Sequence, residues 1–114
     1  MPSQNCTKPL QQNFSDDDLG RIVDEATIYM CACPAQVAVQ LRTLRELYRY
    51  QLSCEQDPGA DQAVHQTIAA ATLQAHELME QCMSRVLEIE GWDRSTLTMP
   101  EGLRRKRDDF LARE

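Results

Sequence analysis

One sharp break in the helical pattern constrains this chain more than any other feature of its sequence. The turn from Glu55 to Gly59 contains Pro58 next to Gly59, the strongest pair of helix breakers in the chain. Helical patterns lead into this turn over about 34–53 and out of it over about 60–90. Because so short a connection favours antiparallel neighbours, the sequence predicts a helical hairpin.

The position of the turn also predicts which residues of the two helices face each other. Counted outward from the turn, facing residues have numbers that sum to about 115. Ala71 and Ala75 then lie opposite Leu44 and Leu41, so that small side chains meet large ones. The face that the later helix turns toward a partner helix is predicted to comprise Val64, Ile68, Ala71, Ala75, Leu78, Cys82, Val86 and Ile89.

A separate helix is predicted before the hairpin, over about 16–30. Ser15 is placed as its N-cap, Asp18 completes a capping box, and Phe14 has the spacing of a hydrophobic staple with Leu19. These local signals predict where the helix begins. Its apolar stripe is predicted to comprise Leu19, Ile22, Val23, Ala26 and Met30.

The first helix of the hairpin is predicted to begin at Pro34, the favoured first helical position, with Cys33 in the N-cap position. Its buried stripe is predicted to comprise Val37, Leu41, Leu44, Tyr48 and Leu52. Its solvent side is predicted to carry charged residues at ion-pair spacing, namely Arg42, Arg45, Glu46 and Arg49.

The rest of the chain predicts the end of the long helix and the domain boundaries. Gly91 is expected to end that helix, with Trp92 packing back beneath it. A short C-terminal helix is predicted over about 100–112. We therefore expect an all-α fold, a small helical bundle in a single domain over 14–114, preceded by a flexible arm over 1–13.

Charge and hydropathy limit the partners and the location that are expected. The chain has 12 basic and 18 acidic residues and a net charge of −6. Because an acidic surface repels phosphate backbones, nucleic-acid binding is not expected, and the basic run at 104–107 is interpreted as a solvated helix face. No membrane-spanning stretch and no secretory signal are recognised, so a cytoplasmic location without membrane association is expected.

Three of the five cysteines are predicted to converge at the end of the hairpin far from its turn. On the register above Cys82 lies opposite Cys33, and Cys31 precedes Cys33 by two residues. A helix N-terminus favours the thiolate form of Cys33. Three thiolates could bind Cu(I), Zn(II) or an iron–sulfur cluster. The alternative interpretation is that these cysteines only pack as small hydrophobic side chains and that the chain has no cofactor.

Sequence signals of catalysis are missing, so an enzyme is not expected. The four glycines are scattered rather than gathered in a phosphate-binding loop, and no Gly-x-Ser-x-Gly motif is present. Two hypotheses follow. The first is a cytoplasmic helical interaction or accessory protein that acts through helix–helix contacts with a protein partner or a second copy. The second is a metal-binding or redox-sensing module that uses Cys31, Cys33 and Cys82.

Overall fold

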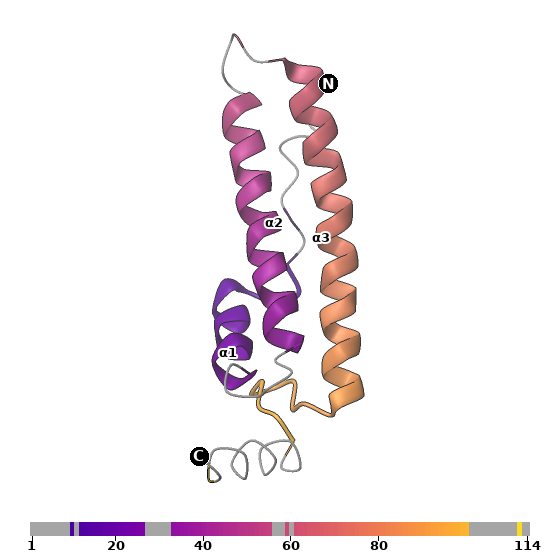
Figure 1. Cartoon of the computed structure of the whole chain (residues 1–114). Helices are drawn as coiled ribbons and strands as arrows, with labels where there is room; N and C mark the ends of the chain where they lie inside the picture. The colour runs from indigo at the N-terminus through magenta and orange to yellow at the C-terminus, as the bar shows by residue number, and fades with distance from the viewer. Residues whose placement is uncertain are drawn as a thin grey trace.

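The computed structural model describes residues 10, 12–26, 33–55, 59, 61–100 and 112. In this part of the chain three helices follow one another, α1 (Asp16–Ala26), α2 (Cys33–Glu55) and α3 (Gln62–Glu90). Figure 1 shows α2 and α3 side by side as an antiparallel pair, with α1 against the end of α2 that is far from the turn. The predicted helical hairpin with a preceding helix is confirmed.

The N-terminus of α1 has the predicted capping box. The backbone N–H of Ser15 donates to Asp18 Oδ2 at 3.0 Å, and the N–H of Asp18 donates to Ser15 Oγ at 3.0 Å. These bonds satisfy two backbone donors that have no partner within the helix. Phe14 and Leu19 are both buried, as the hydrophobic staple requires. The start of α1 is therefore fixed by residues that are close in sequence.

Both ends of α3 are also capped locally. The side chain of Asp61 accepts from the backbone N–H groups of Ala63 and Val64, so the helix begins slightly later than predicted. At the other end Gly91 adopts φ 77°, a left-handed conformation that glycine tolerates. The N–H groups of Gly91 and Trp92 donate to the carbonyls of Glu88 and Leu87, which is the Schellman arrangement. Trp92 is buried beneath this cap, as predicted.

The hydrophobic core occupies the end of the hairpin that is far from the turn. There α1 and the segment after α3 both contribute buried side chains to the core, and the backbone N–H of Met99 donates to Glu25 Oε2 on α1 at 3.3 Å. The side chain of Asp93 organises this segment by accepting from Ser95 and Thr96, and these hydrogen bonds lower the pKa of Asp93. The core comprises Phe14, Leu19, Ile22, Ala26, Ala35, Ala38, Leu41, Met83, Leu87, Trp92, Leu97 and Met99.

The face of α3 that packs in the hairpin differs from the prediction. The predicted face includes Leu78, which is 65% exposed, and Ile89, which is 69% exposed. The buried face is displaced from it by one residue, or about 100° around the helix, and several of its members are polar. It comprises Ala69, Thr72, His76, Glu80, Met83 and Leu87. The prediction that Ala71 packs opposite Leu44 is therefore wrong, since Ala71 is exposed.

The helical register agrees with the count from the turn only near the turn. Gln51 Oε1 and His65 Nδ1 lie 2.7 Å apart, and their numbers sum to 116. Farther along the hairpin Arg45 bonds His76, and these numbers sum to 121. A simple count outward from a turn is therefore less accurate toward the far end of the pair.

Several predictions fall on residues that the structure does not describe. They are the continuation of the first helix to residue 30, most of the arm over 1–13, the basic run at 104–107 and, apart from Pro100 and Ala112, the C-terminal helix over about 100–112. Within the described ranges, no helix combines the length and the apolar character that crossing a bilayer requires.

Candidate functional site

Arg45 lies at the centre of a buried polar cluster that joins all three helices. It was predicted on the solvent side of α2, yet its side chain is only 1% exposed. Its Nε donates to His76 Nε2 at 2.9 Å and its Nη1 to Asp16 Oδ1 at 2.6 Å. Its Nη2 donates both to the carbonyl oxygen of Phe14 at 2.6 Å and to Glu80 Oε2 at 3.0 Å. The solvent-side prediction for Arg45 is therefore wrong.

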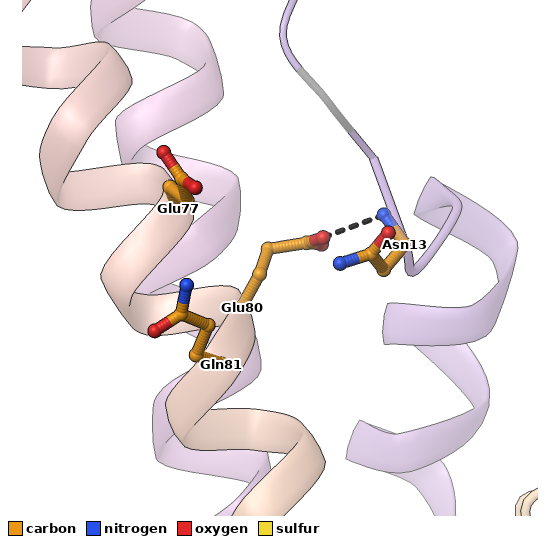
Figure 2. Close-up of a pocket in the computed structure, with 4 residues that line it drawn as sticks. All are labelled: Asn13, Glu77, Glu80 and Gln81. Atoms are coloured by element: carbon orange, nitrogen blue, oxygen red, sulfur yellow. Dashed lines mark hydrogen bonds between the residues drawn. The ribbon is translucent and has the colours of Figure 1, made fainter.

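Glu80 connects α3 to the backbone that precedes α1. Its Oε1 accepts from the backbone N–H of Asn13 at 2.5 Å, and its Oε2 accepts from that of Phe14 at 3.2 Å as well as from Arg45. Figure 2 shows the Glu80 side chain extending from α3 to Asn13. A buried carboxylate is tolerated when a cation and hydrogen-bond donors surround it, and Glu80 has both.

His76 completes the cluster as a neutral hydrogen-bond acceptor. Because Arg45 can only donate, His76 Nε2 must accept, and this assigns the proton of the neutral ring to Nδ1. Burial lowers the pKa of His76 below its ordinary value of 6.5, the positive charge of Arg45 lowers it further, and Glu80 opposes this shift. Among the described residues, no buried side-chain nitrogen or oxygen lacks a partner. The cluster therefore holds the helices together and leaves no buried polar atom free to bind a ligand.

A small polar cavity of about 120 Å³ lies beside this cluster. It is lined by Asn13, Glu77, Glu80 and Gln81; Figure 2 shows Glu80 reaching from α3 toward Asn13, with Glu77 and Gln81 above and below it on α3. Glu80 already binds Arg45 and two backbone N–H groups. For the chain as far as it is described, no group of three His, Cys, Asp or Glu residues is placed to hold a metal ion.

The predicted thiol site is only partly visible. Cys33 is exposed at the first residue of α2, and Cys82 is half-buried on α3. Cys31 lies outside the described residues, so the three-sulfur site remains a prediction. Cys54 is half-buried near the end of α2 next to the turn, at the opposite end of the hairpin from Cys33.

The eight apolar residues of α3 that were expected inside the hairpin are all exposed or half-buried. Their spacing alternates between four and three residues, which keeps them on one side of a helix. Val64 is 49% exposed and Leu78 is 65% exposed, while Ile68, Ala75 and Cys82 are half-buried. We call this surface the α3 seam, and it comprises Val64, Ile68, Ala71, Ala75, Leu78 and Cys82.

A depression of about 300 Å³ lies at the start of the α3 seam. It is lined by Ala63, Val64, Thr67 and Ile68, so its walls are mainly hydrocarbon. Toward the other end of the seam Leu78 projects into solvent. The seam therefore has both a recess and a projecting apolar side chain, which are the two elements of helix–helix packing.

Sequence periodicity found the residues of the seam but not the face that is buried. The missed residues are Arg45, His76 and Glu80. The spacing of His76 and Glu80, four residues apart on one helix face, is the only local signal of their association. Comparison with known proteins finds no matching protein-family model, no similar curated sequence and no similar solved structure, so the function must be argued from these residues.

Proposed function

We propose that this chain is a cytoplasmic helical interaction protein with no catalysis of its own, and that it binds a partner helix on the α3 seam. The observation that carries this proposal is the exposure of large apolar side chains at regular helical spacing, Leu78 above all. Scattered exposed apolar residues are ordinary on protein surfaces, whereas a contiguous apolar stripe is typical of an interaction site. The alternating spacing of the seam fits a helix better than a loop or a strand.

Burial of the α3 seam by a partner helix can contribute enough free energy to support binding. Complete burial of a leucine or valine side chain contributes about 1.5–3 kcal/mol of favourable free energy. A side chain that is half exposed or more in the free protein would gain a large part of this free energy when a partner covers it. Val64 and Leu78 are in this state. Because ordering costs oppose association, rigid elements bind more favourably than flexible ones.

The buried polar cluster supplies that rigidity. Arg45 ties α3 to α2 and to the beginning of α1 through four hydrogen bonds, so the seam is presented on a helix that is already fixed. A partner helix would therefore meet a preformed surface. This division of roles, a polar cluster inside and an apolar seam outside, supports a binding function more than a catalytic one.

Photo-crosslinking in the cells that produce the protein tests this proposal. A photoreactive amino acid at Leu78 should give a defined covalent adduct, whereas the same group at Arg49, an exposed residue of α2, should not. The captured protein, once purified, should bind the wild-type chain and lose affinity for the Leu78→Glu variant but not for Val39→Glu. Both substitutions replace an exposed apolar side chain by an acid. Equal adducts at Leu78 and Arg49, or none at all, would contradict the proposal.

A thiol function is the second candidate, because the exposed Cys33 at the N-terminus of α2 is accessible to metal ions and oxidants. In this proposal Cys31, Cys33 and Cys82 bind Cu(I), Zn(II) or an iron–sulfur cluster, or respond to oxidation. Metal analysis of protein purified without chelator, with a parallel thiol titration, provides the test. Stoichiometric metal that is lost in Cys33→Ser would support it, and metal-free protein with freely reactive thiols would contradict metal binding.

A further inference from the structure

We infer that the partner of the α3 seam is the α3 seam of a second copy, in antiparallel orientation about a two-fold axis that lies between the two helices, level with the midpoint between Ala71 and Ala75. This inference rests on the proposed function and specifies its partner. In this pairing the numbers of facing residues sum to 146. Val64 then faces the second copy's Cys82, Ile68 faces its Leu78, and Ala71 faces its Ala75.

The sizes of the seam residues are symmetric about its centre. Two alanines, Ala71 and Ala75, lie in the middle, and the large pair Ile68 and Leu78 lies on either side of them. When such a helix meets its own reverse, alanine meets alanine and the two axes can approach closely. The large side chains then meet each other beyond the centre. A two-fold contact requires a surface that is complementary to itself, and this order of sizes provides it.

The recess and the projecting side chain lie at matched positions. In antiparallel packing a side chain that faces Ile68 enters the space between the residues around Ile68. Ile68 also forms one wall of the depression lined by Ala63, Val64, Thr67 and Ile68. The side chain that the pairing places against Ile68, at the edge of this depression, is the second copy's Leu78, the most exposed large side chain of the seam. By symmetry the contact occurs twice.

The charges along α3 permit this self-association even though the chain carries a net charge of −6. Between residues 62 and 82 the acidic side chains are Glu77 and Glu80. Glu80 is paired with Arg45, and Glu77, which lines the cavity beside Asn13, lies about 140° around the helix from Val64 and Cys82. The residues that flank the seam on its outer side are the uncharged Thr67, Gln74 and Gln81. Two copies can therefore approach along this surface without placing like charges opposite each other.

The antiparallel orientation follows from the same geometry. A parallel pair in register would place Leu78 beside the second copy's Leu78 and would leave the depression at Val64 and Ile68 facing an identical depression. The antiparallel pair instead places each exposed leucine against Ile68, at the edge of the other copy's depression. We therefore assign the antiparallel arrangement to the dimer.

Sedimentation equilibrium of the full chain under reducing conditions tests the dimer. We expect a concentration-dependent dimer for the wild type and a dissociation constant at least about tenfold higher for Leu78→Glu, which corresponds to about 1.4 kcal/mol. Val39→Glu, which adds the same charge at an exposed position of α2, should dimerise as the wild type does. Circular dichroism confirms that each variant is folded. A wild-type chain that stays monomeric at all accessible concentrations overturns the inference.

Disulfide trapping tests the orientation without depending on a destabilised variant. With the other four cysteines replaced by serine, Val64→Cys should form a covalent dimer with the native Cys82 on oxidation by diamide. In a background that also carries Cys82→Ser, Leu78→Cys should stay reduced, because the two Leu78 positions lie far apart in the antiparallel pair. Trapping through Leu78→Cys alone would overturn the inference. If the purified chain is monomeric while photo-crosslinking at Leu78 captures a different protein, this inference fails and the proposed function stands.

Discussion

Arg45 on α2 and Glu80 on α3 form an ion pair at 3.0 Å in which each side chain is only 1% exposed. Removing two charges from water is costly, and the pair is stabilised because Glu80 also accepts from the backbone N–H groups of Asn13 and Phe14. The helix pair is therefore joined by a polar contact at a position where an apolar one would be the usual solution.

Breaking this pair should be among the most damaging single changes in the chain. We expect Arg45→Ala to lower the free energy of unfolding by about 3–5 kcal/mol, because it leaves the Glu80 carboxylate buried and unpaired. Urea denaturation followed by circular dichroism measures the change. The matched control is Arg85→Ala, since Arg85 and Glu88 form an exposed pair worth about 1 kcal/mol or less. Similar decreases in the free energy of unfolding for the two variants would show that the buried ion pair contributes no more to stability than the exposed one.

The stability of the fold should depend on pH through His76. Its pKa is lowered in the folded state, so below the ordinary value of 6.5 the unfolded chain binds more protons than the folded one. The contribution of His76 to stability is complete above about pH 6.5 and is lost as the pH falls from there toward the lowered pKa. The groups that face it are Arg45 and Glu80.

Comparison of His76→Gln with His65→Gln isolates this effect. A glutamine at position 76 can still accept from Arg45 but does not titrate, so this variant should lose less stability than the wild type between pH 7.5 and 5.5. His65 is half-buried on α3 and bonds Gln51, so His65→Gln tests a histidine outside the cluster. Free energies of unfolding from urea titrations at both pH values decide the matter. A pH response in His76→Gln identical to that of the wild type would rule His76 out as its source.

Substitution by alanine should change the stability of the protein in opposite directions at two glycines. Gly91 has φ 77°, so Gly91→Ala should destabilise the protein by about 1–2 kcal/mol. Gly20 lies inside α1, and a Cβ there would meet only Arg42 Nη2, the mobile end of a long side chain, at 3.2 Å. Gly20→Ala should therefore stabilise the protein by about 0.5–1 kcal/mol. Thermal unfolding of both variants tests the contrast, and a loss of stability at Gly20 would mean that Arg42 cannot move aside.

The contribution of the Ser15 cap of α1 to stability should be measurable with a single substitution. Ser15→Ala removes the hydroxyl that accepts from the N–H of Asp18, and should cost about 1 kcal/mol in the free energy of unfolding. Ser53→Ala, at an exposed position inside α2, provides the control and should be neutral or slightly stabilising. An equal effect at both serines would contradict a capping role for Ser15.

The sequence predicted helix positions well because the signals that start and stop helices are local. Ser15, Asp18 and Gly91 each act on backbone groups within a few residues, and all three have the predicted role. The buried face of α3 could not be predicted in the same way. Hydrophobic periodicity treats Arg45, His76 and Glu80 as solvent-facing, yet all three are buried because Arg45 donates to both His76 and Glu80. That mutual satisfaction depends on contacts between residues 31 and 35 positions apart.

In the candidate site, too, the local pattern could be predicted from the sequence, whereas the long-range contacts could not. Periodicity identified the members of the α3 seam, but it assigned them to the inside of the hairpin because it could not show that a polar face would occupy that place. Whether Cys31 joins Cys33 and Cys82 depends on a connection that the structure does not describe. For residues such as these, the spacing along the sequence shows which of them share one face of a helix. It does not show which other residues that face contacts.

The carboxylate of Glu80 has a consequence for the order in which the molecule assembles. It binds the backbone N–H groups of Asn13 and Phe14, which precede it by 67 and 66 residues. A chain that emerges from the ribosome exposes these two amides long before the residue that will bind them has been made. We therefore expect α1 to reach its final position only after the hairpin that follows it in the chain has closed.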